Sequence, residues 1–306
     1  KAASIAGDLV VQNARVRAIG EDAGGFRPIS EKDLFDCEYW SLEQAKLGKG
    51  APPKFQGKVV MITGGSGTIG FAIAEAFSKL GAQTILVDKD EIALKESVTK
   101  LGVGHKYFPI DVTHSDAANQ ALLAAINNFG GLDILISNAG AAHAGPMLDI
   151  SNEELRNAFE LNFFSHYSFS TEAAKILKDQ NRGGQILFNI SKQAVNPGKN
   201  FGAYGLPKAT TFFLMRQLAL ELGSDGIRVN GINADRIRSG LLTDEFISSR
   251  AKSRGVSESE YMAGNLLNKE VTAEHVADAF TALACAESTT GHVMTVDGGN
   301  VEASLR

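Results

Sequence analysis

The feature that most constrains the fold is an alternation of short apolar runs with helical stretches, which extends from Gly57 to near the C-terminus of this 306-residue chain. Continuous apolar strands separated by helices indicate a parallel sheet that is covered on both faces. Right-handed crossovers then give an α/β fold, a doubly wound (Rossmann-type) parallel sheet within three α/β/α layers. Such a sheet binds its ligands at the carboxyl ends of the strands.

The expected strands are Val59–Ile62, Thr84–Val87, Tyr107–Ile110, Leu132–Ile136, Gln185–Ile190, Ile227–Ile232 and His292–Val296. The expected helices are Ile69–Leu80, one that begins at Glu91, Ala117–Phe129, about 152–178, Tyr204–Leu222 and about 272–285. A polar stretch at about 239–270 interrupts the alternation, and we expect it to form a lid over the substrate.

Residues 1–55 have a different pattern and are expected to form an N-terminal extension with a linker. The segment from Ala2 to Gly20 is compatible with one helix, and Asp36–Leu47 carries aromatic side chains typical of a short docked element. The Gly- and Pro-rich run Gly48–Pro53 is typical of a linker. Residues 56–306 are then the Rossmann-type domain, with the lid at about 239–270.

Composition narrows the possible partners. The net charge is −5, so nothing favours binding to nucleic acid or to an anionic membrane. No apolar run reaches the roughly 18 residues of a membrane span, and no signal-peptide pattern precedes the domain. Cys37 and Cys285 stand in unrelated contexts, so we expect neither a disulfide framework nor a metal site, and a cytoplasmic location is the default.

The run Thr63-Gly-Gly-Ser-Gly-Thr-Ile-Gly70 follows the first strand and opens the first helix. Glycines at such a junction allow a tight turn and a close backbone approach to a pyrophosphate, which the helix N-terminus attracts. The alternative is a plain glycine turn. The position after the first strand favours a dinucleotide site formed by Gly64, Ser66, Gly67, Thr68, Ile69 and Gly70.

Asp88 ends the second strand, 18 residues after Gly70. A carboxylate there accepts hydrogen bonds from both adenosine ribose hydroxyls and repels a 2′-phosphate, so NAD is the expected cofactor. The alternative is a helix N-cap for the segment that starts near Asp90. Lys89 would offset part of the repulsion.

Tyr204 and Lys208 lie four residues apart and therefore share one helix face. An ammonium beside a tyrosine favours the phenolate, which could take a proton from an alcohol while a hydride leaves the carbon. The spacing alone is also common on solvated helix faces, so the pair gains meaning from the nucleotide site around it.

Together these marks resemble the short-chain dehydrogenases/reductases over about residues 57–299. Further marks of that family are Asp111-Val112, Ser137-Asn-Ala-Gly140, Asn162, Ser191 and Val296-Asp-Gly-Gly299. Ser191 precedes Tyr204 by thirteen residues, which is the spacing in that family. The usual assembly of the family implies a homotetramer or dimer.

The resemblance implies a role for each matching residue. Tyr204 would be the general base in oxidation, Lys208 would lower its pKa and hold the nicotinamide ribose, and Ser191 would bond the substrate oxygen. Asn162 would hold a water in a proton relay. The cofactor positions would be Asp111 and Val112 at the adenine, Asn138, Ala139 and Gly140 in the cleft, and Ile237 and Ser239 at the carboxamide.

Three departures from the family pattern stand near the expected site. Thr68 replaces a glycine of the turn, and Ala234-Asp235 replaces a Pro-Gly pair after the sixth strand. Pro207 lies within the helix of Tyr204, where it removes a backbone N–H and could kink the helix.

The segment Leu34–Leu47 resembles the connection in fused proteins that join a class II sugar-phosphate aldolase to a short-chain dehydrogenase. That subgroup is associated with rhamnulose-1-phosphate cleavage and lactaldehyde oxidation. We therefore expect this chain, which begins at Lys1, to be the C-terminal part of a longer fused protein. The alternative is an ordinary dehydrogenase with an N-terminal extension.

The function expected from these features is NAD-dependent oxidation or reduction of a small hydroxy-carbonyl compound, with lactaldehyde as the first choice. Polyols and sugar phosphates are the alternative substrates. Lys192, Arg236 and Arg238 stand near catalytic positions and could bind a carboxylate or phosphate, which would favour a charged substrate, or they could be solvated surface charges. A nucleotide-binding partner of an aldolase, with little turnover of its own, is the alternative of another class.

Overall fold

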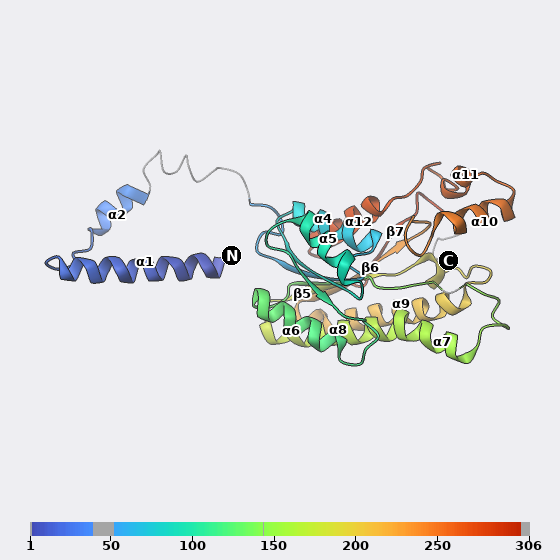
Figure 1. The fold of residues 1–306 in the computed structure, drawn as a ribbon, viewed down its shortest axis with the longest axis horizontal. Helices are drawn as coiled ribbons and strands as arrows, with labels where there is room; N and C mark the ends of the chain where they lie inside the picture. The colour runs from blue at the N-terminus through green and yellow to red at the C-terminus, as the bar shows by residue number, and fades with distance from the viewer. Residues whose placement is uncertain (1, 39–51, 143, 301–306) are drawn as a thin grey trace. The chain divides into compact units, whose positions relative to one another are not determined.

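The computed structural model describes residues 2–38, 52–142 and 144–300, which form two units, Lys1–Gly57 and Lys58–Arg306 (Figure 1). The smaller unit contains the helices α1 (Ala2–Asp22) and α2 (Glu31–Glu38). The long helix expected at its start is confirmed. Most of the docked element expected at Asp36–Leu47, and most of the linker, lie outside the described residues.

The larger unit is built on a seven-stranded sheet in the order β3-β2-β1-β4-β5-β6-β7. All six strand pairings are parallel. The expected doubly wound parallel sheet is therefore confirmed. The strands are β1 (Val59–Thr63), β2 (Gln83–Asp88), β3 (Lys106–Pro109), β4 (Ile134–Ser137), β5 (Gly184–Asn189), β6 (Ile227–Ala234) and β7 (Val293–Val296).

Helices cover both faces of this sheet (Figure 1). One layer contains α4 (Thr68–Lys79), α5 (Glu91–Leu101) and α12 (Ala273–Cys285). The other layer contains α6 (Ala117–Phe129), α7 (Asn152–Phe159), α8 (Ser165–Gln180) and α9 (Gly202–Leu222). The unit also contains short helical turns: the π-turn η1 (Glu160–Phe164) and the 3₁₀ turns η2 (Lys192–Ala194) and η3 (Gly223–Asp225).

The core explains the apolar runs in the sequence. Every residue of β1 is buried, because alternate side chains point to opposite helix layers. Val59 and Met61 pack with the layer of α6, α8 and α9. Each Å² of apolar surface that is buried stabilises the fold by about 25 cal/mol. Because these strands are buried on both faces, they contribute strongly to the stability of the domain.

Residues 239–270, expected to form a lid, contain the helices α10 (Asp244–Arg254) and α11 (Glu258–Met262). These two helices share a small core of their own, in which Ile247, Tyr261 and Met262 are buried. The segment is therefore an ordered subdomain attached after β6, and not a structureless loop.

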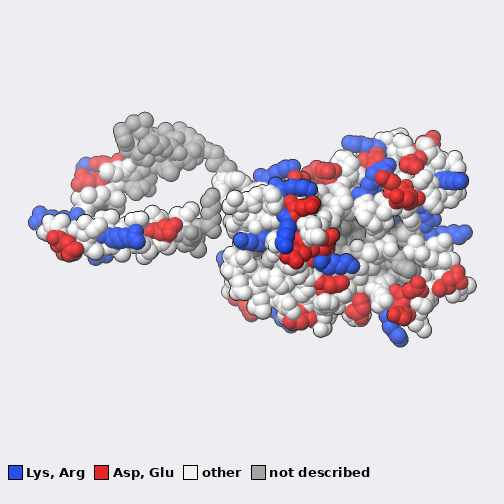
Figure 2. Space-filling model, in the orientation of Figure 1, with Lys and Arg blue, Asp and Glu red and all other residues white. Residues whose placement is uncertain are grey.

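The surface carries no uniformly charged face in the view of Figure 2, where Lys and Arg are interspersed with Asp and Glu. Within the described ranges, none of the helices is both long and apolar enough to cross a membrane.

Candidate active site

A cleft of about 1210 Å³ lies at the carboxyl ends of the strands. This is the edge at which β1 has β2 on one side and β4 on the other, so the chain crosses over in opposite directions and leaves a crevice. The volume exceeds that of most small-molecule pockets and is large enough for a dinucleotide beside a substrate. All of the site residues expected from the sequence line this cleft except Ser66 and Asn162.

The glycine turn joins β1 to α4 with a backbone conformation that leaves no space for side chains. A Cβ on Gly70 would lie 2.1 Å from the carbonyl oxygen of Gly64, and Gly64 itself has a φ of 63°. Gly67 is the N-cap of α4 and has no side chain to occupy the first N–H groups of that helix. These groups and the helix dipole therefore face the cleft, which fits a pyrophosphate.

Thr68 departs from the family pattern without disturbing this turn. It is the first residue of α4, lines the cleft, and has no positive φ that would require glycine. A β-carbon is therefore tolerated there.

Asp88 is held in place by backbone groups at the end of β2. Its carboxylate accepts from the N–H of Lys89 at 2.8 Å and from the N–H of Ser66 at 3.3 Å. Ser66 thus supports Asp88 from behind the cleft wall. The N-cap of α5 is Asp90, whose carboxylate accepts from the N–H of Ala93 at 3.0 Å. Asp88 is consequently not the helix cap, and its carboxylate faces the cleft.

Asp111 and Asn138 mark the next two strand ends. The Asp111 carboxylate accepts two bonds from Thr113, and the backbone N–H of Thr113 is the main cause that lowers the pKa of Asp111. The side chain of Asn138 donates to the carbonyl of Thr63 at 3.0 Å and accepts from Asn189 at 2.8 Å. Asn138 therefore fastens β1, β4 and β5 together at the cleft.

Asn162 lies behind the cleft in a π-turn that interrupts the long helix expected at 152–178. The side-chain amide of Asn162 forms hydrogen bonds with the backbone of Ala141 and Ala158. The backbone carbonyl of Asn162 accepts from the Thr211 hydroxyl at 2.7 Å. A single π-turn inside a helix frequently marks a functional site. A Cβ on Gly140 would lie 2.9 Å from the Asn162 side chain, so glycine allows this close approach. The role of Asn162 as a water holder stays a prediction.

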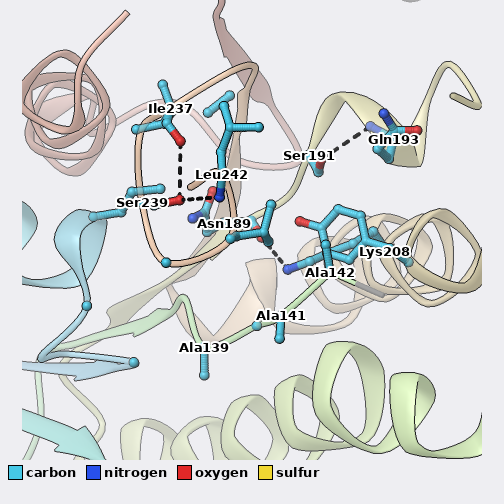
Figure 3. Close-up of a pocket in the computed structure, with 18 of the residues that line it drawn as sticks. Ala139, Ala141, Ala142, Asn189, Ser191, Gln193, Lys208, Ile237, Ser239 and Leu242 are labelled. Atoms are coloured by element: carbon cyan, nitrogen blue, oxygen red, sulfur yellow. Dashed lines mark hydrogen bonds between the residues drawn. The ribbon is translucent and has the colours of Figure 1, made fainter. Parts of the chain in front are cut away.

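Tyr204 and Ser191 meet on one wall of the cleft. Ser191 follows β5, and its hydroxyl accepts from the N–H of Gln193 at 3.2 Å (Figure 3). Tyr204 is buried in the first turns of α9, and burial raises its pKa to about 12, although a hydrogen bond to Ser191 opposes this shift. The phenol is thus protonated at neutral pH.

Lys208 is almost completely buried one turn further along α9. Its ammonium donates to the carbonyl of Asn189 at 3.0 Å (Figure 3). Its Nζ lies 5.9 Å from the centre of the Tyr204 ring. Burial lowers the pKa of Lys208 to about 7. Burial of the phenol is the main cause of the raised pKa of Tyr204, and the expected effect of Lys208 on that pKa stays a prediction.

His166 is a site residue that sequence reasoning missed. Its Nε2 lies 3.4 Å from Nζ of Lys208, and its Nδ1 lies 2.6 Å from the Ser137 hydroxyl. An ammonium can only donate, so Nε2 accepts and the ring proton lies on Nδ1. Burial, together with the charge of Lys208, holds the pKa of His166 well below its usual value. The sequence feature that could have indicated His166 is its position one helix turn after Asn162.

Ile237 and Ser239 lie on the opposite wall, after β6. The Ser239 hydroxyl donates to the carbonyl of Ile237 at 3.2 Å, and Ile237 is buried (Figure 3). This bond shapes the loop into a short turn beside Leu242.

The remaining departures from the family pattern are accommodated. The Asp235 carboxylate accepts from Asn300 at 2.6 Å, so its charge is held inside the loop. Arg238 bonds Glu270 at 2.7 Å and does not line the cleft, in contrast to Lys192 and Arg236. The helix α9 continues through Pro207.

Comparison with known proteins identifies the family. The sequence profile described as enoyl-(acyl carrier protein) reductase matches residues 65–300. The chain belongs to the short-chain dehydrogenase/reductase family. Residues 1–47 match the profile of the second domain of class II aldolases, so both resemblances expected from the sequence are confirmed.

Relatives and solved structures of this family agree with that identification. The chain is 34% identical to the uncharacterized oxidoreductase YuxG of Bacillus subtilis over 92% of its own length, and it spans 43% of that protein. It is 30% identical to the glucose 1-dehydrogenase of Gluconobacter oxydans, with 80% of this chain and 92% of that one covered. Among structures, the L-sorbose reductase of Gluconobacter frateurii, complexed with NADPH and L-sorbose, has a TM-score of 0.74 at 28% identity, with 81% and 98% of the two chains covered.

Proposed function

We propose that this short-chain dehydrogenase/reductase uses NAD to oxidise or reduce a small hydroxy-carbonyl compound or alcohol. The observation that supports this most directly is the arrangement of Ser191, Tyr204 and Lys208 on one wall of a cleft that also contains the glycine turn and Asp88. Proton transfer and nucleotide binding are therefore available in one place.

The residues of the cleft fit a dinucleotide. The first turn of α4 would hold the pyrophosphate, Asp88 the adenosine ribose, and Asp111 with Val112 the adenine. Ile237 and Ser239 would face the carboxamide. When bound, the nicotinamide ring exchanges a hydride with the substrate carbon. The choice of NAD over NADP rests on the Asp88 carboxylate, which would repel a 2′-phosphate.

Replacing Asp88 by alanine tests that choice. We expect the KM for NAD to rise about 10- to 100-fold, because charge-assisted hydrogen bonds to the ribose are lost. The KM for NADP should change far less. Steady-state kinetics with both cofactors measures this, and Asp90→Ala, which removes only the cap of α5, is the matched control. Unchanged NAD kinetics in Asp88→Ala would show that Asp88 does not contribute to cofactor binding.

The proton chemistry follows from the protonation states. A protonated Tyr204 can donate its proton to a carbonyl oxygen in reduction and, by reversal, accept the hydroxyl proton in oxidation. Ser191 donates to the same substrate oxygen and stabilises its developing charge. Lys208, held by Asn189 and His166, places a positive charge beside the phenol when it is protonated.

Lactaldehyde is the first substrate to test, because the aldolase-like segment at residues 1–47 points to a reaction that follows sugar-phosphate cleavage. Polyols and sugar phosphates are the second candidates, and the cations that line the cleft favour the phosphates among them. Among the described residues no cysteine lines the cleft, so aldehyde oxidation would proceed on the hydrate. Hydride transfer at a secondary alcohol suits the site better.

The test is NADH formation with lactaldehyde, propanediols, polyols and their phosphates, run beside Tyr204→Phe. Turnover that depends on Tyr204 supports the proposal. Binding of NAD without turnover on any of these compounds would instead support a nucleotide-binding partner of an aldolase. The fusion itself, which we propose from the profile match at residues 1–47, is decided by the coding sequence upstream of Lys1.

We also propose assembly of identical chains through the outer face of η1, α8 and α9. Large apolar side chains are exposed there: Phe164, Tyr167, Leu206, Phe213 and Leu220. Monomers rarely expose apolar patches of this kind. Light scattering should show a tetramer or dimer, and Phe213→Asp should shift it to smaller species. A monomeric wild-type protein would contradict the assembly.

A further inference from the structure

The end of the cleft away from the glycine turn is unusually basic. Five cationic side chains line it, and we call them the basic wall: Lys192, Lys199, Arg236, Arg250 and Arg254. The carboxylates that line the same region are Asp235 and Glu160. A cleft lined with an excess of one sign of charge concentrates ligands of the opposite sign.

Part of the basic wall is neutralised internally. Asp235 lies 3.5 Å from Nε of Arg236 and 3.9 Å from Nζ of Lys192. Arg236 also donates to the carbonyl of Tyr261 at 2.8 Å. These contacts fasten the loop after β6 to η2 through Lys192 and to α11 through Arg236, so both residues have a structural role.

Arg250 and Arg254 differ from them. Among the described residues, no carboxylate forms an ion pair with either guanidinium. They lie one turn apart on α10, where like charges repel and destabilise a helix. An anionic ligand would supply the counter-charge that neither guanidinium receives from a carboxylate among the described residues.

Aromatic rings orient both guanidinium groups. The Cζ of Arg250 lies 5.0 Å from the ring centre of Phe201 and 5.3 Å from that of Phe246, and the Cζ of Arg254 lies 5.3 Å from the ring centre of Tyr261. Contact with a ring covers the flat face of a guanidinium and leaves its N–H edge for an acceptor. That edge matches the two oxygens of a carboxylate or phosphate.

This pair stands close to the reacting groups. Phe201, which Arg250 covers, is the N-cap of α9, and its carbonyl accepts from the N–H of Tyr204 at 3.1 Å. Arg250 also donates to the carbonyl of Lys199 at 3.3 Å. Arg250, Arg254 and Tyr204 line the same cleft, so one substrate could place its anionic group at the arginines and its reacting oxygen at the phenol.

We infer that Arg250 and Arg254 bind a phosphate or carboxylate group of the substrate. This inference rests on the proposed function, because it assigns the substrate class of the same site. Lactaldehyde has no anionic group, so the inference favours a phosphorylated or carboxylated hydroxy compound over lactaldehyde itself.

The test compares anionic compounds with their neutral counterparts: glycerol 3-phosphate with glycerol, and lactate with lactamide. Wild-type kcat/KM should favour the anionic member of at least one pair, and the two pairs distinguish phosphate from carboxylate. Arg250→Gln or Arg254→Gln should lower that kcat/KM about 10- to 100-fold, mainly through KM, and leave the KM for NAD unchanged. Lys252→Gln, which removes an exposed charge from the same helix, is the control and should have no effect.

Calorimetric titration of the same four compounds separates this inference from the proposed function. Binding of an anionic compound that weakens at least 10-fold in Arg250→Gln supports the inference even if no NADH forms, in which case the proposed function fails. Tyr204-dependent turnover of neutral compounds, without binding of either anion, would overturn the inference and leave the function standing. Equal loss of activity on both members of a pair would also overturn it.

Discussion

Replacement of Tyr204 by phenylalanine is expected to lower kcat about 10²- to 10⁴-fold, which is the usual contribution of a positioned general acid or base. The change removes only the hydroxyl. The ring keeps its packing in α9, where Tyr204 is buried, so folding should be preserved. The KM for NAD should change little, because the pyrophosphate and adenosine contacts lie on the glycine turn and Asp88.

The measurement is NADH formation with whichever compound the wild-type protein turns over fastest, together with a titration of NAD binding. Tyr107→Phe, which removes a hydroxyl from β3, is the matched control and should retain full activity. If the Tyr204→Phe variant keeps nearly all of the wild-type turnover, the proposed mechanism is wrong. A folded variant that binds NAD and has lost turnover would confirm that the phenol moves the proton.

Local sequence pattern was sufficient for the sheet, the glycine turn and Asp88. Each of these depends on neighbours in the chain: apolar runs set the strands, and a glycine with no space for a Cβ marks the turn. Asp88 followed from its place at the end of β2. The same logic placed Tyr204 and Lys208 on one helix face, because a spacing of four residues determines that face.

Contacts between distant segments were beyond such reasoning. His166 contacts Lys208, which lies 42 residues further along the chain, and no local sequence pattern predicts this contact. Asp235 accepts a hydrogen bond from Asn300, 65 residues further along the chain, and this bond explains how the loop tolerates a charge there. Arg238 seemed close to the site in sequence, yet its bond to Glu270 holds it outside the cleft. Burial, which raises the pKa of Tyr204, is likewise a property of the whole fold and not of the local sequence.

Replacement of Lys208 by methionine should separate the catalytic role of this lysine from its effect on stability. We expect kcat/KM to fall by about 10²-fold or more, because the charge beside the phenol is lost. The effect on stability concerns its dependence on pH. The pKa of Lys208 is about 7 in the folded protein and about 10.5 in the unfolded chain.

Between these two values the unfolded chain binds a proton that the folded protein lacks, so the free energy of unfolding rises with pH in the wild type. The rise should amount to about 2 kcal/mol between roughly pH 7.5 and 9.5, and it should be missing from Lys208→Met. Urea denaturation at the two pH values measures it, with Lys178→Met, an exposed lysine on α8, as the control that keeps the wild-type slope. His166 does not interfere, because its unfolded pKa of 6.5 lies below this window. Equal slopes in wild type and Lys208→Met would show that Lys208 stays charged in the folded protein across this range, and the folded-state pKa of about 7 would then be wrong.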